Sequence, residues 1–192
     1  MEDTPTREAV VPRLRGRFGR EYTYVESCPS TQRLLAPDAP EGAVAVADEQ
    51  TEGRGRLGRR WEAAAGTSVL CSVQLRPAVD PAQFPELTVV GAEACAEAIR
   101  TVTELEPMLK HPNDVLIGGR KVAGILAEAS DGRVVLGIGI NVSQTESELP
   151  AGVEATSLRL SGAHAIDRAA LLATVLERLE ARYDAWVSDA GT

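Results

Sequence analysis

The sequence predicts an α/β domain of the α+β type, with a mixed, largely antiparallel sheet flanked by helices. Three observations predict it: two apolar runs of strand length, a stretch that contains two hairpin turns, and two longer runs with helical spacing. The two apolar runs are residues 43–47 and 67–75, and the stretch with two hairpin turns is residues 114–142. The two runs with helical spacing are residues 84–102 and 167–187.

The first part of the chain predicts two strands and two short helical stretches. Residues 1–19 are polar and contain two prolines, so they form a short helix or a loose tail. Residues 20–27 alternate and carry aromatic side chains, as strands do. Ser30 is a suitable N-cap for a helix that ends at Pro37. The buried strand 43–47 then runs into a segment rich in arginine and glycine.

The second part predicts a helix, a meander and a final helix. Small residues in the helix 84–102 suggest close packing on the sheet. Residues 108–110 form a short strand, and the turns Gly118-Gly119 and Asp131-Gly132 create three antiparallel strands. Residues 143–165 are mostly loop. Asp167 caps the last helix, and Trp186 lies on its apolar stripe, so we expect Trp186 in the core.

Composition and charge exclude several classes of protein. The chain has 192 residues, of which 44% are hydrophobic and 25% charged, and these values are ordinary for one globular domain. It has no apolar run of about 18 residues, and its first twenty residues are charged. We therefore expect no membrane span, no signal peptide and a cytoplasmic location. The net charge of −8 opposes an extended nucleic-acid surface.

The cysteines and histidines do not indicate a structural metal or a disulfide framework. The three cysteines are an odd number, and no two of them form a CxxC pair. Cys71 and Cys95 lie in apolar runs and are expected to be buried. The two histidines, His111 and His164, are far apart in the sequence.

The segment Gly53-Arg54-Gly55-Arg56-Leu57-Gly58-Arg59-Arg60-Trp61 has four arginines and three glycines in nine residues. Arginine donors match carboxylate and phosphate oxygens, and glycines let the backbone approach a ligand closely. Alternatively, the segment is only a flexible, solvated basic loop. On an acidic protein, a local positive segment suits a small anionic ligand better than a duplex.

Other polar positions allow both a structural and a functional interpretation. Ser30 and Thr31 either cap a helix or point donors at a ligand. Lys121 either extends over the sheet face or snorkels from a hairpin. Asn113 and Asp114 either form a turn or bind hydrated Mg²⁺. The strand segment 137–141 is not a dinucleotide fingerprint, and its glycines mark close approach of a ligand to the backbone.

Taken together, these segments resemble the catalytic domain of the biotin protein ligases, over about residues 22–187. The resemblance is specific because five motifs occur in the family's order and spacing. They are Ser30-Thr31, Gln50 with residues 53–61, Lys110-His111-Pro112-Asn113-Asp114, residues 121–128, and residues 137–142.

The resemblance implies a fold similar to the catalytic core of class II aminoacyl-tRNA synthetases. It also implies two half-reactions, in which biotin and Mg-ATP give biotinyl-5′-AMP and a lysine of a biotin carboxyl carrier domain then accepts biotin. The implied partners are biotin, ATP and the carrier, without nucleic acid or membrane. We expect a monomer or a weak homodimer.

The resemblance also implies roles for individual residues. The implied catalytic residues are Arg56, Lys121, Asp114 and Lys110, with Asp114 also the implied Mg²⁺ ligand. The implied biotin-binding residues are Ser30, Thr31, Gln50, Gly53, Arg54, Lys121, Gly124, Leu126 and Gly139. The implied ATP or adenylate residues are Arg56, Arg59, Trp61, Asn113, Lys121 and Asn141.

The chain departs from the family pattern at several points. His111 stands where Trp is usual, Gln32 where Asn or Asp is more common, and Leu57 where a basic residue is frequent. We expect one catalytic domain over residues 20–188. We also expect no SH3-like C-terminal domain, and no N-terminal DNA-binding domain of the kind that repressors carry.

The sequence leaves three alternative functions to compare with biotin ligation. A lipoate or octanoate ligase shares the fold, but the arginine segment and the Lys-x-Pro-Asn-Asp motif favour biotin. A non-catalytic biotin-binding module would keep the site without the transfer step. A nucleic-acid binder would show steep salt dependence, and the acidic balance opposes it.

Overall fold

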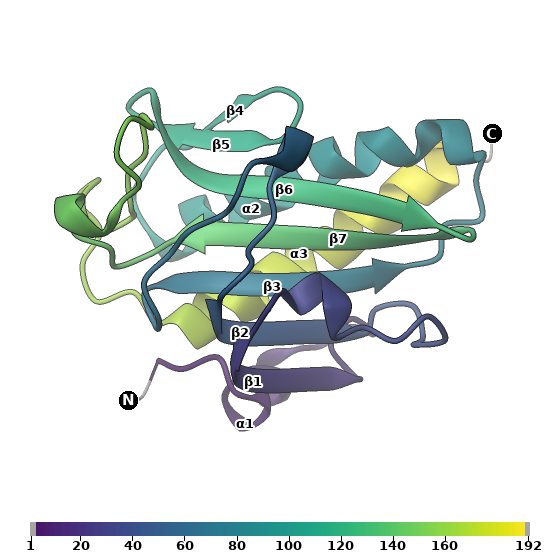
Figure 1. Ribbon diagram of the computed structural model, residues 1–192. Helices are drawn as coiled ribbons and strands as arrows, with labels where there is room; N and C mark the ends of the chain where they lie inside the picture. The colour runs from purple at the N-terminus through teal and green to yellow at the C-terminus, as the bar shows by residue number, and fades with distance from the viewer. Residues whose placement is uncertain (1–2, 191–192) are drawn as a thin grey trace.

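The computed structural model describes residues 3–190 and has a seven-stranded sheet in the order β1-β2-β3-β7-β6-β5-β4 (Figure 1). The β1–β2 pair is parallel and the other pairs are antiparallel, which confirms the prediction of a mixed, largely antiparallel sheet. The strands are β1 (Tyr22–Cys28), β2 (Val44–Gln50), β3 (Ser68–Leu75), β4 (Met108–Lys110), β5 (Asp114–Ile117), β6 (Arg120–Ser130) and β7 (Arg133–Asn141).

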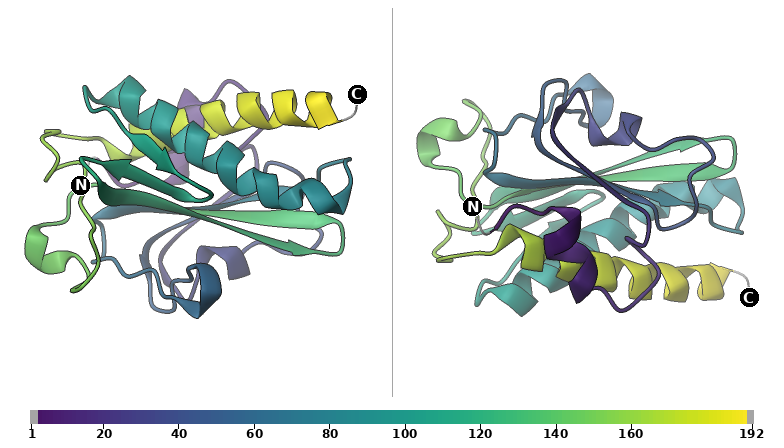
Figure 2. Two further views of the ribbon diagram at one scale, coloured as in Figure 1. Left: turned by 90° about the horizontal axis from the view of Figure 1, so that it is seen from above. Right: turned by 90° about the horizontal axis from the view of Figure 1, so that it is seen from below.

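The two long helices lie on one face of the sheet, as Figure 2 shows in both views. The helices are α1 (Arg7–Val10), α2 (Leu87–Val102) and α3 (Arg168–Ala190), and the 3₁₀ turns are η1 (Val11–Arg13), η2 (Thr31–Arg33), η3 (Arg56–Gly58), η4 (Pro81–Glu86) and η5 (Glu146–Glu148). Within residues 3–190, no helix is long and apolar enough to cross a membrane.

Alternation along the strands separates the two faces of the sheet. In β3, Cys71 and Val73 belong to the core under the helices, whereas Ser72 between them points to the other face. In β7, Ile138 and Ile140 likewise pack into that core. The helices therefore fill one face, and the opposite face is left for loops and the site. Burial of Cys71, and of Cys95 in α2, confirms the prediction for these two cysteines.

Local predictions at the ends of the helices were mostly correct. Asp167 caps α3, because its Oδ1 accepts hydrogen bonds from the backbone N–H groups of Ala169 at 2.9 Å and Ala170 at 3.0 Å. Trp186 packs against the core, as expected. Ser30 does stand at the predicted N-cap position, but the predicted helix is only the single turn η2, and the Ser30 side chain makes no capping hydrogen bond. The N–H of Thr31 is bonded instead by Oε1 of Gln50, at 2.8 Å.

The N-terminal segment is anchored to the rest of the fold. Val10 and Phe18 are 0% and 1% exposed and belong to the main core. Glu180 of α3 accepts hydrogen bonds from the backbone N–H groups of Arg17 and Phe18, at 2.9 Å and 3.1 Å. Of the two alternatives for this segment, the structure therefore shows a short helix, α1, tied down by burial and hydrogen bonds.

Candidate active site

A cavity of about 470 Å³ opens on the face of the sheet away from α2 and α3. Its walls come from η2, from the arginine segment 53–61 that crosses in front of the sheet (Figure 1), and from the loop 150–155. Most of the predicted site residues line it. These are Ser30, Thr31, Gln50, Arg54, Arg56, Arg59, Trp61, Asn113, Lys121, Gly124, Leu126, Gly139 and Asn141.

Glycines make up part of the cavity floor. Gly124 of β6 faces Gly139 of β7 across the ladder, and Leu126 faces Gly137. A Cβ atom at position 139 would lie 2.6 Å from the Trp61 ring, and one at position 124 would lie 3.0 Å from it. Only glycine lets a flat ring lie this close to the sheet. The glycines thus allow a close approach to the backbone, as predicted, but the group that approaches is the protein's own Trp61 indole rather than a ligand.

The arginine segment folds back on itself and presents Trp61 to the cavity. The N–H of Trp61 donates to the carbonyl of Gly53 at 3.0 Å, and the N–H of Gly55 donates to the carbonyl of Arg59 at 2.8 Å. A Cβ atom at position 53 would lie 2.3 Å from the Trp61 carbonyl oxygen. Gly53 therefore shapes the segment and lines a second hollow beside the cavity, rather than the cavity itself.

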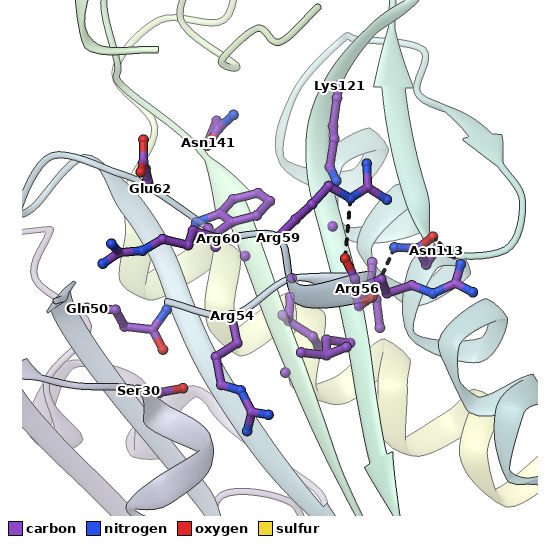
Figure 3. Close-up of a pocket in the computed structure, with 18 of the residues that line it drawn as sticks. Ser30, Gln50, Arg54, Arg56, Arg59, Arg60, Glu62, Asn113, Lys121 and Asn141 are labelled. Atoms are coloured by element: carbon purple, nitrogen blue, oxygen red, sulfur yellow. Dashed lines mark hydrogen bonds between the residues drawn. The ribbon is translucent and has the colours of Figure 1, made fainter. Parts of the chain in front are cut away.

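The arginine side chains spread from this segment in different directions (Figure 3). Arg56 donates to Oδ1 of Asn113 at 2.9 Å. Arg54 forms a two-pronged ion pair with Glu128 of β6, with both N–O distances 2.8 Å. Arg59 extends toward Lys121 and donates to the carbonyl of Arg56 at 3.3 Å. Positive charge is therefore held on several sides of the cavity.

Lys121 stands beside the indole on a backbone that is fixed on both sides. Its N–H donates to the Glu154 carbonyl and its carbonyl accepts from Thr156, both at 2.8 Å. The ammonium lies 2.7 Å from Oδ1 of Asp114 and 5.6 Å from the centroid of the Trp61 ring. The Lys121 side chain thus extends over the sheet face. Of the two interpretations given above, this is the functional one.

Away from Lys121 and Arg56, several uncharged polar groups gather in the lining, with Arg54 and Arg60 nearby (Figure 3). Oε1 of Gln50 accepts from the N–H of Thr31 at 2.8 Å and from its hydroxyl at 3.2 Å. The Thr31 and Ser72 hydroxyls lie 2.8 Å apart. Ser30 is buried beside them. A ligand with an anionic end and a neutral polar end would match this arrangement.

Asn141 lines the cavity, yet its amide is engaged within the protein. Its Nδ2 donates to the carbonyl of Thr156, and its Oδ1 accepts from Gln144, both at 3.0 Å. Gln144 also donates to the Ser68 hydroxyl at 2.6 Å. Through these bonds Asn141 holds the loop that follows β7 against the site.

Two predicted catalytic residues lie outside the cavity lining. Lys110 is exposed at the end of β4. Asp114 lies behind Lys121 as its ion-pair partner. Oδ1 of Asn113 is taken by Arg56, and among residues 3–190 no three acidic, histidine or cysteine side chains form a metal-binding group. A magnesium ion that arrives with ATP needs only one or two protein carboxylates beside the phosphates, so the role of Asp114 as a Mg²⁺ ligand stays a prediction.

Several lining residues were not predicted. The sequence shows Gln32 only as a departure from the family pattern, whereas the structure places it against Gly137 on the cavity floor. Strand alternation could have found Ser72, because it points to the same face as the glycines. The loop 150–155 gave no sequence signal, because its place depends on the bonds of Asn141 and Lys121.

A family model described as the biotin/lipoate A/B protein ligase family matches residues 24–144. The chain is 38% identical over 177 residues to the bifunctional ligase/repressor BirA of Bacillus subtilis, covering 86% of this chain and 54% of that protein. It is 40% identical over 180 residues to the biotin–[acetyl-CoA-carboxylase] ligase of Mycobacterium tuberculosis, covering 89% and 67%. The chain thus spans about half the length of the Bacillus relative.

Solved structures show the same likeness. The biotin protein ligase of Aquifex aeolicus in complex with biotin and ATP superimposes with a TM-score of 0.78 at 34% identity, covering 89% of this chain and 73% of that one. This confirms the predicted biotin ligase catalytic fold. On the matched motifs, the site and the fold, the chain belongs to the biotin/lipoate A/B protein ligase family.

Proposed function

We propose that this chain is an ATP-dependent biotin protein ligase. The observation that carries the proposal is a glycine-floored cavity with Arg56 and Lys121 at one end and neutral hydrogen-bonding groups at the other. Biotin has a matching division, with a carboxylate at the end of an aliphatic chain and a neutral ureido ring. The names of the relatives agree with this assignment.

In the first step an oxygen of the biotin carboxylate attacks the α-phosphorus of ATP, and pyrophosphate leaves. The two reacting groups are both anionic, so fixed cations must hold them together. Lys121 and Arg56 supply these charges, and each is oriented by a neighbour, Asp114 or Asn113. ATP would enter as its magnesium complex, with the ion on its phosphates and Asp114 as the carboxylate that could add to its ligands.

In the second step the amine of a carrier lysine attacks the acyl carbon of biotinyl-5′-AMP, and AMP leaves. The mixed anhydride must be kept from water until the carrier arrives. The arginine segment and Trp61 line the cavity, and the segment crosses in front of the sheet (Figure 1), which suits them to this task. The proposed partner is the biotin carboxyl carrier domain of an acyl-CoA carboxylase.

The test is to incubate the purified chain with biotin and Mg-ATP and to look for biotinyl-5′-AMP by mass spectrometry. Lipoate and octanoate are run in parallel, and the Lys121→Met variant is the control. Adenylate from biotin, absent in the control, is expected, followed by transfer to an added carrier domain. Adenylate from lipoate or octanoate alone would assign the chain to the other branch of the family. Biotin binding without adenylate would indicate a binding module.

A further inference from the structure

Exposed apolar side chains stand on two of the segments that wall the cavity. Among residues 3–190, four large apolar side chains are exposed, and two of them belong to these segments. Leu57 of η3 is 90% exposed, and Val153 of the loop 150–155 is 54% exposed. Figure 1 shows the dark-blue η3 turn in front of the sheet and the green loop at its left edge. Exposed apolar groups that gather around a site indicate contact with a partner.

The Leu57 side chain contributes little to the fold. Arg56 lines the cavity, whereas Leu57 next to it does not. The backbone of Leu57 is left-handed, with φ 59° and ψ 37°, and this conformation costs free energy for a residue with a large side chain. Leu57 thus combines backbone strain with an apolar side chain in water. Because neither stabilises the folded chain, a role outside the fold accounts for both.

The surface beside Leu57 is hollowed and positively charged. The second hollow, of about 500 Å³, borders Leu57 and shares Arg56 and Arg59 with the cavity. The exposed side chains of Arg59 and Arg60 donate only to the backbone carbonyls of Arg56 at 3.3 Å and Thr51 at 2.7 Å, within the described chain. Since no described carboxylate pairs with these two arginines, the surface fits a partner that presents acidic side chains beside apolar ones.

We propose that Leu57 and Val153 form the contact surface for the carrier domain in the second step. This inference rests on the proposed function and names the surface that its protein substrate meets. The carrier lysine has to enter a cavity walled by the arginine segment and the loop 150–155, so the domain behind it rests on these walls. Apolar contacts on both walls, with arginines beside Leu57, suit a carrier that has apolar and acidic side chains around its lysine.

The experiment separates carrier docking from adenylate formation. Leu57→Asn replaces the apolar side chain with a polar one that tolerates the left-handed conformation, and Val153→Thr keeps the shape of the side chain. The matched control is Met108→Gln, at a 71% exposed apolar position of β4 outside the cavity lining. Each chain is loaded with biotinyl-5′-AMP and mixed with increasing amounts of a biotin carboxyl carrier domain, and the transfer rate is measured.

Leu57→Asn should raise the carrier concentration at half-maximal rate roughly five- to twentyfold, and Val153→Thr about threefold, because apolar contact area is lost. The maximal transfer rate should not change, nor should the rate of adenylate formation in Leu57→Asn. Met108→Gln should behave as the unmodified chain does. Added salt should raise the half-maximal carrier concentration, because it screens the exposed arginines from an acidic partner.

Several results would overturn the proposal. Unchanged carrier dependence in Leu57→Asn and Val153→Thr, with biotin adenylate still formed, would refute the docking surface and leave the proposed function standing. An effect of Met108→Gln as large as that of Leu57→Asn would show that the apolar contact is unspecific. A half-maximal carrier concentration that does not respond to salt would refute the acidic partner. Failure of the unmodified chain to form biotin adenylate would refute both the docking surface and the proposed function.

Two further measurements test other occupants of the same surface. Faster hydrolysis of the bound adenylate in Leu57→Asn, measured without carrier, would make Leu57 a cover of the cavity instead of a docking residue. Dissociation of a dimer in Leu57→Asn, measured by sedimentation, would assign the surface to a second copy of this chain. The proposal expects neither change.

Discussion

Lys121 places its positive charge inside the cavity and shares it with Asp114, at 2.7 Å. We expect Lys121→Met to lower the rate of adenylate formation by at least about a hundredfold, because a fixed charge at the reacting anions is lost. Asp114→Asn should cost on the order of tenfold, since the ammonium remains but is less well oriented. Pyrophosphate release under single-turnover conditions measures both rates. Equal losses would mean that Asp114 takes part in the chemistry itself.

The glycines of the floor differ in what a methyl group would meet. At position 139 it would lie 2.6 Å from the Trp61 ring, whereas at position 137 it would lie 3.1 Å from the end of the Gln32 side chain. Gly139→Ala should therefore displace the indole and lower the free energy of unfolding by about 1–3 kcal/mol. Gly137→Ala should cost less, because a side-chain end can move.

Trp61 fluorescence, read in a Trp186→Phe background, measures the displacement, and urea unfolding measures the stability. If both alanine variants leave the Trp61 emission unchanged, the position of the indole does not depend on the glycines of the sheet.

Among the elements, the arginine segment is tied to the sheet in part by an exposed ion pair. The Arg54–Glu128 pair fixes it to β6, with the two side chains 47% and 34% exposed. Exposed pairs contribute at most about 1 kcal/mol, so Glu128→Gln should raise the rate of trypsin cleavage in the segment by only a few-fold. Biotin with ATP should slow the cleavage, because the segment orders over the adenylate.

The matched control is Glu146→Gln, which breaks the Arg120–Glu146 pair of 2.7 Å without touching the arginine segment. Equal cleavage rates with and without ligands would show that the segment does not close over them. A change in Glu146→Gln as large as that in Glu128→Gln would show that the effect is general loosening.

The N-terminal segment is held in a different way, by burial. Phe18 is 1% exposed, and its ring lies 5.8 Å from that of Tyr183 in α3. Phe18→Ala should lower the free energy of unfolding by about 3–5 kcal/mol, because it leaves a cavity in the core. Arg15→Ala, at an exposed position of the same segment, should change it by less than about 0.5 kcal/mol. Urea unfolding tests both, and equal effects would contradict the anchoring.

Every long element could be predicted from the sequence because its signal is local. Hairpin turns, alternation and helical spacing lie within a few residues of one another, as in residues 114–142. Contacts between distant segments could not be predicted in this way. The Arg54–Glu128 pair joins residues 74 positions apart, and the position of Gln32 depends on where β6 and β7 meet. The motifs named most of the cavity lining, whereas the partners that orient those residues required the fold.

For the molecule as a whole, the charge is divided unevenly. The chain carries a net charge of −8, yet the cavity is lined by four arginines and Lys121. We expect the negative remainder to disfavour nucleic acid and the local positive charge to attract small anions. Raising the salt concentration should therefore weaken ATP binding much less steeply than it would weaken a DNA complex.

The pH dependence of stability is also a property of the whole core. Burial raises the pKa of the Cys71 thiol to about 12, and burial together with the Asp48 contact raises the pKa of Tyr24 to about 12. Burial also raises the pKa of Tyr22 and Tyr183. Between the unfolded and folded pKa values the folded chain keeps protons that the unfolded chain releases. The stability that these buried thiol and phenol groups contribute is therefore fully present below their unfolded pKa values, and it is lost as the pH rises toward their folded pKa values.

We expect the free energy of unfolding to decline from about pH 8.5 upward, where an unfolded thiol begins to ionise. A fully buried thiol such as Cys71 contributes a slope of about 1.4 kcal/mol per pH unit within that window. Urea unfolding at a series of pH values from neutral upward measures the slope. Cys71→Ala should make the slope shallower, whatever the variant's stability at neutral pH. If the free energy of unfolding does not change across this pH range, these groups ionise within the folded core.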